Sequence, residues 1–260
     1  MGRELERKIP AQRRTEIRAL LGRRGSASIS EISVALGVSG STVRRDLDEL
    51  DREGVVRRSH GGAVTVQGTA FEYRFEDRRR HNPEEKKRIG DFAATLLEAG
   101  QSVVFDSSST VLAAAEALGR RYLGVAAVTN DVGVASVLAE APGVSVVVPG
   151  GEIRDGSFTL LGSYTQAFLT GLHVDVAFVG IHAITGDTLS ESSLDVVEAK
   201  RAMMRAAHRV ILLADHSKFR PPSFFEVARM GRFDDLVTDD AAPPEALEAV
   251  RASGTRVHLA

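Results

Sequence analysis

Asp106 is followed directly by four hydroxyl residues, Ser107-Ser108-Ser109-Thr110, which together could bind an anion. Hydroxyl groups donate and accept hydrogen bonds, and a helix that starts here would add free backbone N–H groups and a favourable dipole. An ordinary helix cap uses one or two hydroxyl groups and leaves the rest of this cluster unexplained. The cluster therefore predicts a phosphate site.

Three further polar groups, Thr129-Asn130, Gly150-Gly151 and Asp215-His216-Ser217-Lys218, also follow short apolar runs. The glycines permit a sharp turn or the close approach of a ligand to the backbone. Lys218 offers a point charge suited to phosphate, and Asp215 offers an acceptor suited to hydroxyl groups. Gathered around one crevice, these groups would suit a phosphorylated sugar or polyol.

A different chemistry is indicated near the amino terminus, where hydroxyl and guanidinium groups share one predicted helix. Val43 and Leu47 repeat at helical spacing, so the opposite face is centred on Ser41 and Arg45 and is flanked by Thr42 and Arg44. Arg is the side chain best suited to a bidentate contact with guanine. The pattern predicts a helix that reads DNA bases; the alternative is a solvated amphipathic helix of a bundle.

The elements around this helix support the DNA-binding interpretation. An amphipathic helix is expected over residues 10–21, and Ser28 with Glu31 has the spacing of a capping box that opens a second helix. Ser39 is a good N-cap for the third helix, and strands are expected over residues 55–58 and 63–66. This order is that of a winged helix-turn-helix. Its wing would place three basic residues against phosphates, namely Arg57, Arg58 and His60.

The remainder of the chain alternates apolar runs with helical stretches. We expect strands over residues 102–105, 125–128, 144–148, 174–179, 210–214, 236–237 and 257–259. Helices are expected over residues 82–97, 111–118, 131–138, 196–207 and 244–253. This alternation predicts an α/β domain with a mainly parallel sheet, helices on both faces and a ligand crevice at the carboxyl ends of the strands.

The formal net charge of -2 over 260 residues conceals an asymmetry. Residues 1–66 carry 13 Lys and Arg against 9 Asp and Glu, a net charge of +4, and the rest carries -6. The expected organisation is a DNA-binding domain over 1–66, a linker over 67–81 anchored by Phe71 or Tyr73, and a sensing and oligomerisation domain over 82–260.

Several classes of function lack their usual signatures. The absence of cysteine excludes disulfides, thiolate metal sites and Cys nucleophiles. No Gly-x-Gly fingerprint, P-loop or paired histidine spacing is present, so no metal and no cofactor is expected. With no apolar leader and no run of about 18 apolar residues, a cytoplasmic protein without a membrane partner is expected.

The stretch from Ile32 to Val64, ISVALGVSGSTVRRDLDELDREGVVRRSHGGAV, resembles the amino-terminal signature of DeoR-family bacterial transcription regulators. The later segments FD-SSST, VTN, PGG, DVAFVG, KRAMM and ADHSKF resemble the sugar-phosphate-sensing domain of that family, which is similar in fold to ribose-5-phosphate isomerase and glucosamine-phosphate deaminase. For the first domain, the resemblance implies DNA contacts by Ser39, Ser41, Thr42, Arg44 and Arg45. For the second, it implies an effector site made by Lys86, Asp106, Ser107, Ser109, Thr110, Thr129, Asn130, Gly150, Gly151, Gly180, Lys200, Asp215 and Lys218.

One position departs from the family pattern. Ser108 stands where the family usually has glycine in Asp-x-Gly-Thr/Ser-Thr. The added Cβ and hydroxyl group would restrict the backbone or narrow the pocket. The departure therefore bears on which effector binds.

The sequence as a whole predicts a transcription regulator, specifically a repressor of carbohydrate-metabolism genes. Its expected partners are a double-stranded DNA operator, a sugar phosphate effector and further copies of itself in a dimer or tetramer. Two alternatives remain. An enzyme would use Asp106 or Asp215 as a base and Lys218 to stabilise an enediolate. An interaction scaffold without DNA would bind in a salt-insensitive way.

Overall fold

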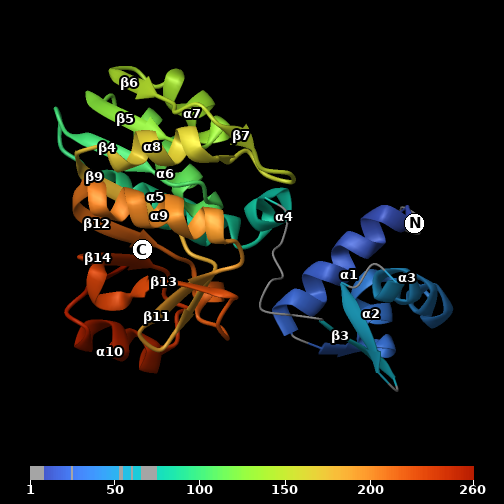
Figure 1. Cartoon of the computed structure of the whole chain (residues 1–260). Coiled ribbons are helices and arrows are strands. Elements are labelled where there is room, and N and C mark those ends of the chain that lie inside the picture. The colour runs from blue at the N-terminus through green and yellow to red at the C-terminus, as the bar shows by residue number, and fades with distance from the viewer. Residues whose placement is uncertain (1–8, 25, 53–54, 60, 66–74) are drawn as a thin grey trace, which may run out of the picture. The chain divides into compact units, whose positions relative to one another are not determined.

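The computed structural model describes residues 9–24, 26–52, 55–59, 61–65 and 75–260 (Figure 1). The chain divides into two compact units, Met1–Phe71 and Glu72–Ala260. Each unit has its own hydrophobic core, as expected for domains that fold around separate sets of apolar residues. We therefore describe the two units one after the other.

Three helices of the first unit pack around a small core, and their bounds are α1 (Pro10–Arg24), α2 (Ile29–Leu36) and α3 (Gly40–Arg52). Ser28 caps α2 by accepting a hydrogen bond from the Glu31 N–H group, and the Glu31 carboxylate returns to the Ser28 N–H group at 2.7 Å. Gly37 ends α2 in the left-handed conformation, with a φ of 67°. Both helix boundaries thus follow from local sequence chemistry.

A three-stranded sheet completes this unit in the order β1-β3-β2, with bounds β1 (Ser26–Ser28), β2 (Val56–Ser59) and β3 (Gly62–Thr65). The hairpin of β2 and β3 was expected, whereas β1 was not. Gly62 pairs with Ser28 across the sheet, and a Cβ at position 62 would collide with the carbonyl oxygen of Ala27. Position 62, where β3 pairs with β1, therefore requires a glycine.

The second unit contains a seven-stranded sheet in the order β15-β14-β12-β9-β4-β5-β6, in which every neighbouring pair is parallel. The bounds are β4 (Ser102–Phe105), β5 (Val125–Thr129), β6 (Val144–Val147), β9 (Val174–Val179), β12 (Ala207–Leu213), β14 (Asp235–Thr238) and β15 (Arg256–Leu259). The predicted mainly parallel α/β fold is confirmed, and all seven expected strands belong to this sheet.

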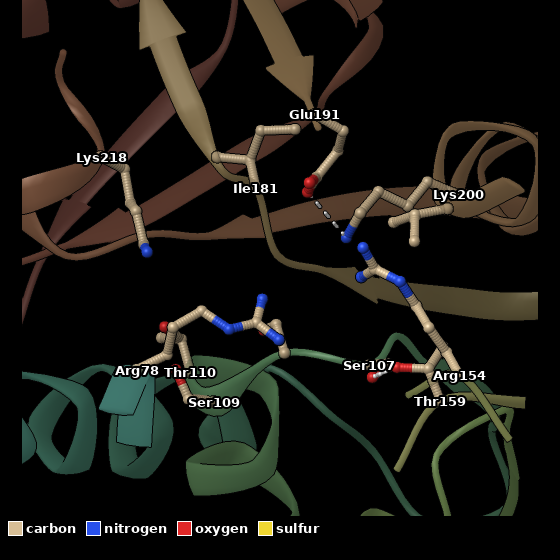
Figure 2. A pocket seen from close by; sticks show the side chains of 12 residues that line it. Arg78, Ser107, Ser109, Thr110, Arg154, Thr159, Ile181, Glu191, Lys200 and Lys218 are labelled. Carbon is tan, nitrogen blue, oxygen red and sulfur yellow. Dashed lines mark hydrogen bonds and ion pairs between the residues drawn. The ribbon is translucent and has the colours of Figure 1, made fainter. Parts of the chain in front are cut away.

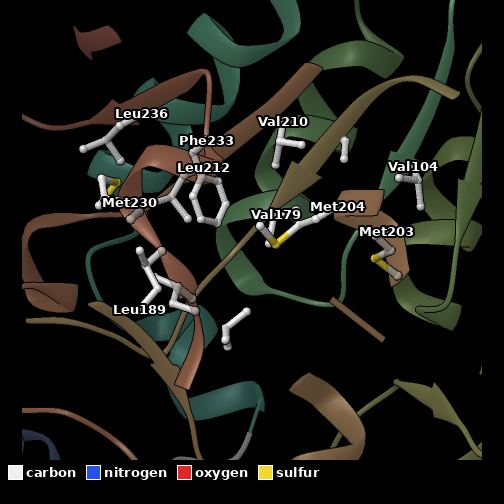
Figure 3. Packing of buried hydrophobic residues seen from close by; sticks show 14 of the residues in the cluster. Val104, Val179, Leu189, Met203, Met204, Val210, Leu212, Met230, Phe233 and Leu236 are labelled. Atoms are coloured by element: carbon white, nitrogen blue, oxygen red, sulfur yellow. The ribbon is translucent and has the colours of Figure 1, made fainter. Parts of the chain in front are cut away.

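Helices cover both faces of the sheet. Successive residues of a strand point to opposite faces, so they pack into two different hydrophobic clusters. Val104, Val179 and Leu212 pack into one cluster, part of which is drawn in Figure 3, together with Leu169 and Met203 from the helices. Their strand neighbours, such as Val103 and Phe178, pack into the other cluster. The helices have the bounds α5 (Pro83–Thr95), α6 (Ser109–Gly119), α7 (Val132–Ala139), α8 (Ser163–Thr170), α9 (Leu194–Ala206) and α10 (Pro244–Ala252).

Several elements of this unit were not expected from the sequence. The segment expected to be a linker contains a helix, α4 (Phe75–Arg80), whose first residue is buried, whereas the expected anchors Phe71 and Tyr73 lie outside the described residues. A small antiparallel sheet joins β10 (Ala183–Thr185), β11 (Thr188–Glu191) and β13 (Phe225–Arg229), and β7 (Glu152–Ile153) pairs with β8 (Leu160–Leu161). No helix in the described ranges is long and apolar enough to span a bilayer.

Candidate functional site

Helix α3 presents hydroxyl and guanidinium groups to solvent. Its buried side includes Val43 and Leu47, whereas Ser41, Arg44 and Arg45 are exposed. Ser39 precedes the helix and accepts a hydrogen bond from the Thr42 N–H group at 3.3 Å, so the start of α3 has the expected cap. The first turns of α3 thus offer Arg and hydroxyl groups of the kind that contact base edges.

Of the three basic residues predicted for the wing, the structure describes the side chain of Arg58 alone. The Arg58 guanidinium group donates to the carbonyl oxygen of Arg44 at 3.0 Å and pairs with Asp48 at 2.9 Å, so it binds α3 within this unit. Arg57 belongs to β2, but its side chain is outside the described part of the structure, as is the whole of His60. The predicted phosphate contacts of these three residues remain predictions.

In the second unit, a pocket lies where β4 ends and α6 begins (Figure 2). Its wall combines hydroxyl groups from the start of α6 with basic side chains from α4, the β7–β8 hairpin and the turn after β12. The lining residues are Arg78, Ser107, Ser108, Ser109, Thr110, Arg154, Thr159, Ile181, Glu191, Val196, Lys200 and Lys218. Four of these twelve side chains are basic and one is acidic, so the pocket favours an anion.

Lys200 on α9 anchors a buried ion cluster at one side of the pocket. Its ammonium group donates to the Asp106 carboxylate and to the carbonyl oxygen of Gly180, the latter at 2.8 Å, and lies 3.5 Å from the Glu191 carboxylate. Burial alone would lower the pKa of Lys200, but Asp106 and Glu191 outweigh burial and raise it. Lys200 therefore stays protonated, and Asp106 serves to hold it.

A second cluster stands behind Lys218. Asp215 accepts hydrogen bonds from the Asn82 side chain at 2.9 Å and the Ser217 N–H group at 3.0 Å, and its other oxygen lies 3.5 Å from the Lys86 ammonium group. Burial would raise the pKa of Asp215, but Lys218 and Lys86 together hold it below its ordinary value. Asp215 is thus a carboxylate that balances two lysines.

The pKa values of Lys218 and Lys86 are both lowered. Burial lowers the pKa of Lys218 to about 8, although Asp215 opposes the shift, and burial also lowers the pKa of Lys86. Lys86 is buried against backbone carbonyl oxygens, whereas Lys218 is half-buried and lines the pocket. Of the two, Lys218 is the cation that a bound anion would contact.

The hydroxyl residues that follow β4 both make hydrogen bonds within the fold and line the pocket. Ser108 caps α6 by accepting a hydrogen bond from the Val111 N–H group at 3.0 Å, and Ser107 donates to Asp131 at 2.6 Å. The Ser108 backbone is extended, with a φ of -148°, so the serine at this position, where the resemblance led us to expect glycine, causes no backbone strain. A Cβ at Gly180 would collide with the Ser108 side chain.

The predicted effector residues therefore fall into three sets. Ser107, Ser109, Thr110, Lys200 and Lys218 line the pocket. A supporting set lies outside that lining and holds the lining lysines or adjoins them, namely Lys86, Asp106, Gly180 and Asp215. The remaining predicted residues, which also lie outside the lining, are Thr129, Asn130, Gly150 and Gly151.

Some of this last set make contacts within the fold. Asn130 donates to the carbonyl oxygen of Leu160 at 3.0 Å, and the Gly150 carbonyl oxygen accepts from the Thr165 hydroxyl group at 2.7 Å. The sequence interpretation missed the pocket residues Arg78 and Arg154. Arg78 belongs to the basic run Arg78-Arg79-Arg80, and its spacing gives no sign that it faces the pocket.

Comparison with known proteins gives a family for both units. The model of the DeoR-like helix-turn-helix domain matches residues 13–69, and that of the DeoR C-terminal sensor domain matches residues 81–240. The chain belongs to the DeoR family. Both predictions, of the family and of a DNA-binding transcription regulator, are therefore confirmed.

Relatives of this DeoR-family protein are similar over nearly their whole length. The chain is 32% identical to the putative aga operon transcriptional repressor of Escherichia coli O157:H7, covering 96% of this chain and 93% of the relative. It is 32% identical to the HTH-type transcriptional regulator GlpR of Haloferax volcanii, over 96% and 97% of the two chains. The glycerol-3-phosphate regulon repressor of Escherichia coli is 31% identical, over 90% and 91%.

Similarity to solved structures is weaker. Ribose 5-phosphate isomerase A of Methanocaldococcus jannaschii matches 54% of this chain and 55% of its own, with 17% identity and a TM-score of 0.41. The probable sor operon regulator of Shigella flexneri matches 54% and 79%, with 15% identity and a TM-score of 0.37.

Proposed function

We propose that this DeoR-family protein is a cytoplasmic repressor of carbohydrate-metabolism genes, whose affinity for its operator changes when a phosphorylated sugar or polyol binds in the pocket of the second unit. The observation that carries the proposal is the pocket itself, where Lys218, Arg78 and Arg154 line the same wall as the hydroxyl groups at the start of α6. A phosphate group suits the basic side chains and the helix N-terminus, and the hydroxyl groups suit a polyol.

On the DNA side, α3 would enter the major groove and place Arg44 and Arg45 against base edges. Ser39, Ser41 and Thr42 at the start of the helix would contact bases or phosphates. One such domain reads few base pairs, so a symmetric dimer or tetramer would bind half-sites spaced by about one helical turn or a multiple of it. The effector would favour an arrangement that no longer matches this spacing.

The names of two relatives agree with repression, and one of them names a polyol phosphate. One is named for the aga operon and another for the glycerol-3-phosphate regulon, and both are called repressors. A coupling free energy of about 1–3 kcal/mol between pocket and operator would weaken operator binding by roughly 5- to 150-fold. This range is enough for a genetic switch.

An enzymatic role receives less support from the pocket. The two carboxylates that the sequence offered as bases, Asp106 and Asp215, are outside the lining and pair with Lys200 and Lys86. The carboxylate that does line the pocket, Glu191, lies 3.5 Å from the Lys200 ammonium group. A turnover assay with sugar phosphates separates the two roles, since product formation at ordinary enzyme rates of about 1 per second or more would refute a pure sensor.

The decisive experiment screens phosphate esters against their unphosphorylated counterparts. Thermal shift would be measured with glycerol 3-phosphate, ribose 5-phosphate and fructose 6-phosphate, each beside the free polyol or sugar. Any ester that stabilises the protein is then tested for release of an operator selected in vitro from random DNA. We expect stabilisation and release by at least one ester and by none of the free sugars; equal responses to the free sugars would refute phosphate recognition.

The same assay tests the role of Lys218 and the DNA-binding mode. Lys218→Ala should leave operator binding intact and remove the effector response.

Operator affinity should also fall with salt, with a slope of about -0.9 in log K per phosphate contact. Binding that is insensitive to salt would instead favour an interaction scaffold.

A further inference from the structure

Helix α4 is the first described element of the second unit after the boundary between residues 71 and 72. It is only six residues long, and a helix this short is not stable by itself. Its order therefore depends on contacts with the rest of the unit. Those contacts connect α4 with the side of the unit that carries the pocket.

Phe75 and Arg78 join α4 to the pocket side of the unit. The Phe75 ring is buried and packs edge-on against Phe158 with a centroid distance of 5.8 Å, while its N–H group donates to the Gly156 carbonyl oxygen at 3.2 Å. One turn later, the Arg78 guanidinium carbon lies 5.7 Å from the Phe75 ring centroid. The Arg78 side chain extends from α4 into the pocket, on the side of Ser109 and Thr110 (Figure 2).

The carboxyl end of α4 is held by the ion cluster behind Lys218. The Lys86 ammonium group donates to the carbonyl oxygens of Arg78, at 3.0 Å, and of His81. The same ammonium group pairs with Asp215, whose charge in turn acts on Lys218. The side chain and the carbonyl group of Arg78 are thus both tied to groups that surround the anion pocket.

We propose that Arg78 binds the anionic group of the effector, and that this contact makes α4 the element through which pocket occupancy changes operator affinity. The inference rests on the proposed function and adds the structural element that couples the pocket to operator binding. A bound ligand shifts an equilibrium only by contacts that differ between two states. An anion at Arg78 supplies such a contact, because it orders a short helix that follows directly after the DNA-binding unit in the chain.

The neighbouring arginines provide matched controls on the same helix. Arg79 is mostly exposed and lies 3.5 Å from Glu116, and Arg80 is exposed; neither lines the pocket. Arg78→Gln and Arg80→Gln remove the same charge from α4, and only the first removes a pocket contact. Lost net charge therefore cannot explain a difference between the two variants.

Two measurements on the full chain test the inference. First, amide hydrogen exchange over residues 75–80 is followed with and without inorganic phosphate. We expect phosphate to slow exchange in the wild type and in Arg80→Gln, and to have no effect in Arg78→Gln. Second, operator affinity is measured with and without the ester that releases the wild-type protein most effectively from the panel above.

For Arg80→Gln, we expect unchanged affinity for both operator and ester. For Arg78→Gln, we expect affinity for the ester weakened by about 10-fold or more. We further expect no release of operator even when ester saturates the pocket. Full release at saturation would show that Arg78 binds the anion without coupling, and an unchanged ester affinity would remove it from the site; either result overturns the inference and leaves the proposed function standing. Failure of every ester to affect the wild type overturns both.

Discussion

Arg13 on α1 binds Asp46 on α3 through two contacts, from Nε to Oδ2 at 2.8 Å and from Nη2 to Oδ1 at 3.1 Å. Asp46 is buried, and its hydrogen bond raises the pKa of Arg13. Because Asp46 follows Arg45 directly, this bidentate pair, together with the buried apolar side of α3, helps to fix the rotation that leaves Arg45 exposed. Contacts from α1 thus contribute to the orientation of the α3 face that carries Arg45.

Replacing Asp46 should destabilise the amino-terminal unit. Asp46→Asn leaves the Arg13 guanidinium group without its carboxylate, and losing the charged partner of a part-buried pair costs about 1.5–3 kcal/mol. We expect urea denaturation of the full chain, followed by circular dichroism, to show an earlier transition for the helical amino-terminal unit. The control is Glu49→Gln, which removes an exposed pair with Arg52 and should change stability by less than about 1 kcal/mol.

Arg45→Ala should separate DNA recognition from folding. Arg45 is exposed, so its removal should leave the melting temperature and the affinity for effector unchanged. A lost bidentate contact with a base costs about 1–3 kcal/mol, which predicts roughly 5- to 150-fold weaker binding to the selected operator, with little change on random DNA. Fluorescence anisotropy measures both affinities. Arg52→Ala, near the other end of α3, is the comparison; loss of effector binding in Arg45→Ala would indicate misfolding instead.

Effector affinity should fall as the pH rises through about 8, because burial lowers the pKa of Lys218 to about 8. The protonated amine binds the anion below this pH, and the neutral amine does not, whereas a phosphate ester stays dianionic above about pH 7. Calorimetric titration of an active ester should show affinity about tenfold weaker at pH 9 than at pH 7. Lys218→Arg stays charged over this range and should flatten the profile; an equally steep profile in that variant would assign the titration to another group.

The two pocket lysines should differ in their effect on stability. Lys200→Met leaves the buried carboxylates of Asp106 and Glu191 without a cation and should cost about 3–5 kcal/mol at pH 7. Lys218→Met removes a half-buried cation whose pKa burial has already lowered, so thermal denaturation should show a change within about 1 kcal/mol. Equal losses would contradict the division of roles.

Local signals account for most of what the sequence predicted correctly. The Ser28 and Glu31 capping box, the seven apolar strands and the hydroxyl groups before α6 are all readable within a few residues. The pocket is a different case, because Arg78 and Arg154 reach it from elements far apart in the chain. The short helix that carries Arg78 has no sustained apolar stripe and depends on tertiary contacts for its order.

The roles of the carboxylates were equally hidden from the sequence. Asp106 pairs with a lysine 94 residues away, and Asp215 binds the side chain of Asn82, 133 residues away. A polar residue at a strand end has the same appearance in the sequence whether it faces a ligand or a buried cation. The strand-end rule located the region of the pocket, whereas long-range pairing decided which oxygens face it.

The fit of Ser108 against Gly180 links two positions on neighbouring strand ends. Because the Ser108 side chain occupies the space that a Cβ at position 180 would need, only one of the two positions can carry a side chain in this backbone arrangement. A mutational path that adds a side chain at position 180 must therefore first change position 108 to glycine. Single substitutions made in the opposite order pass through a protein in which the side chains at positions 108 and 180 overlap.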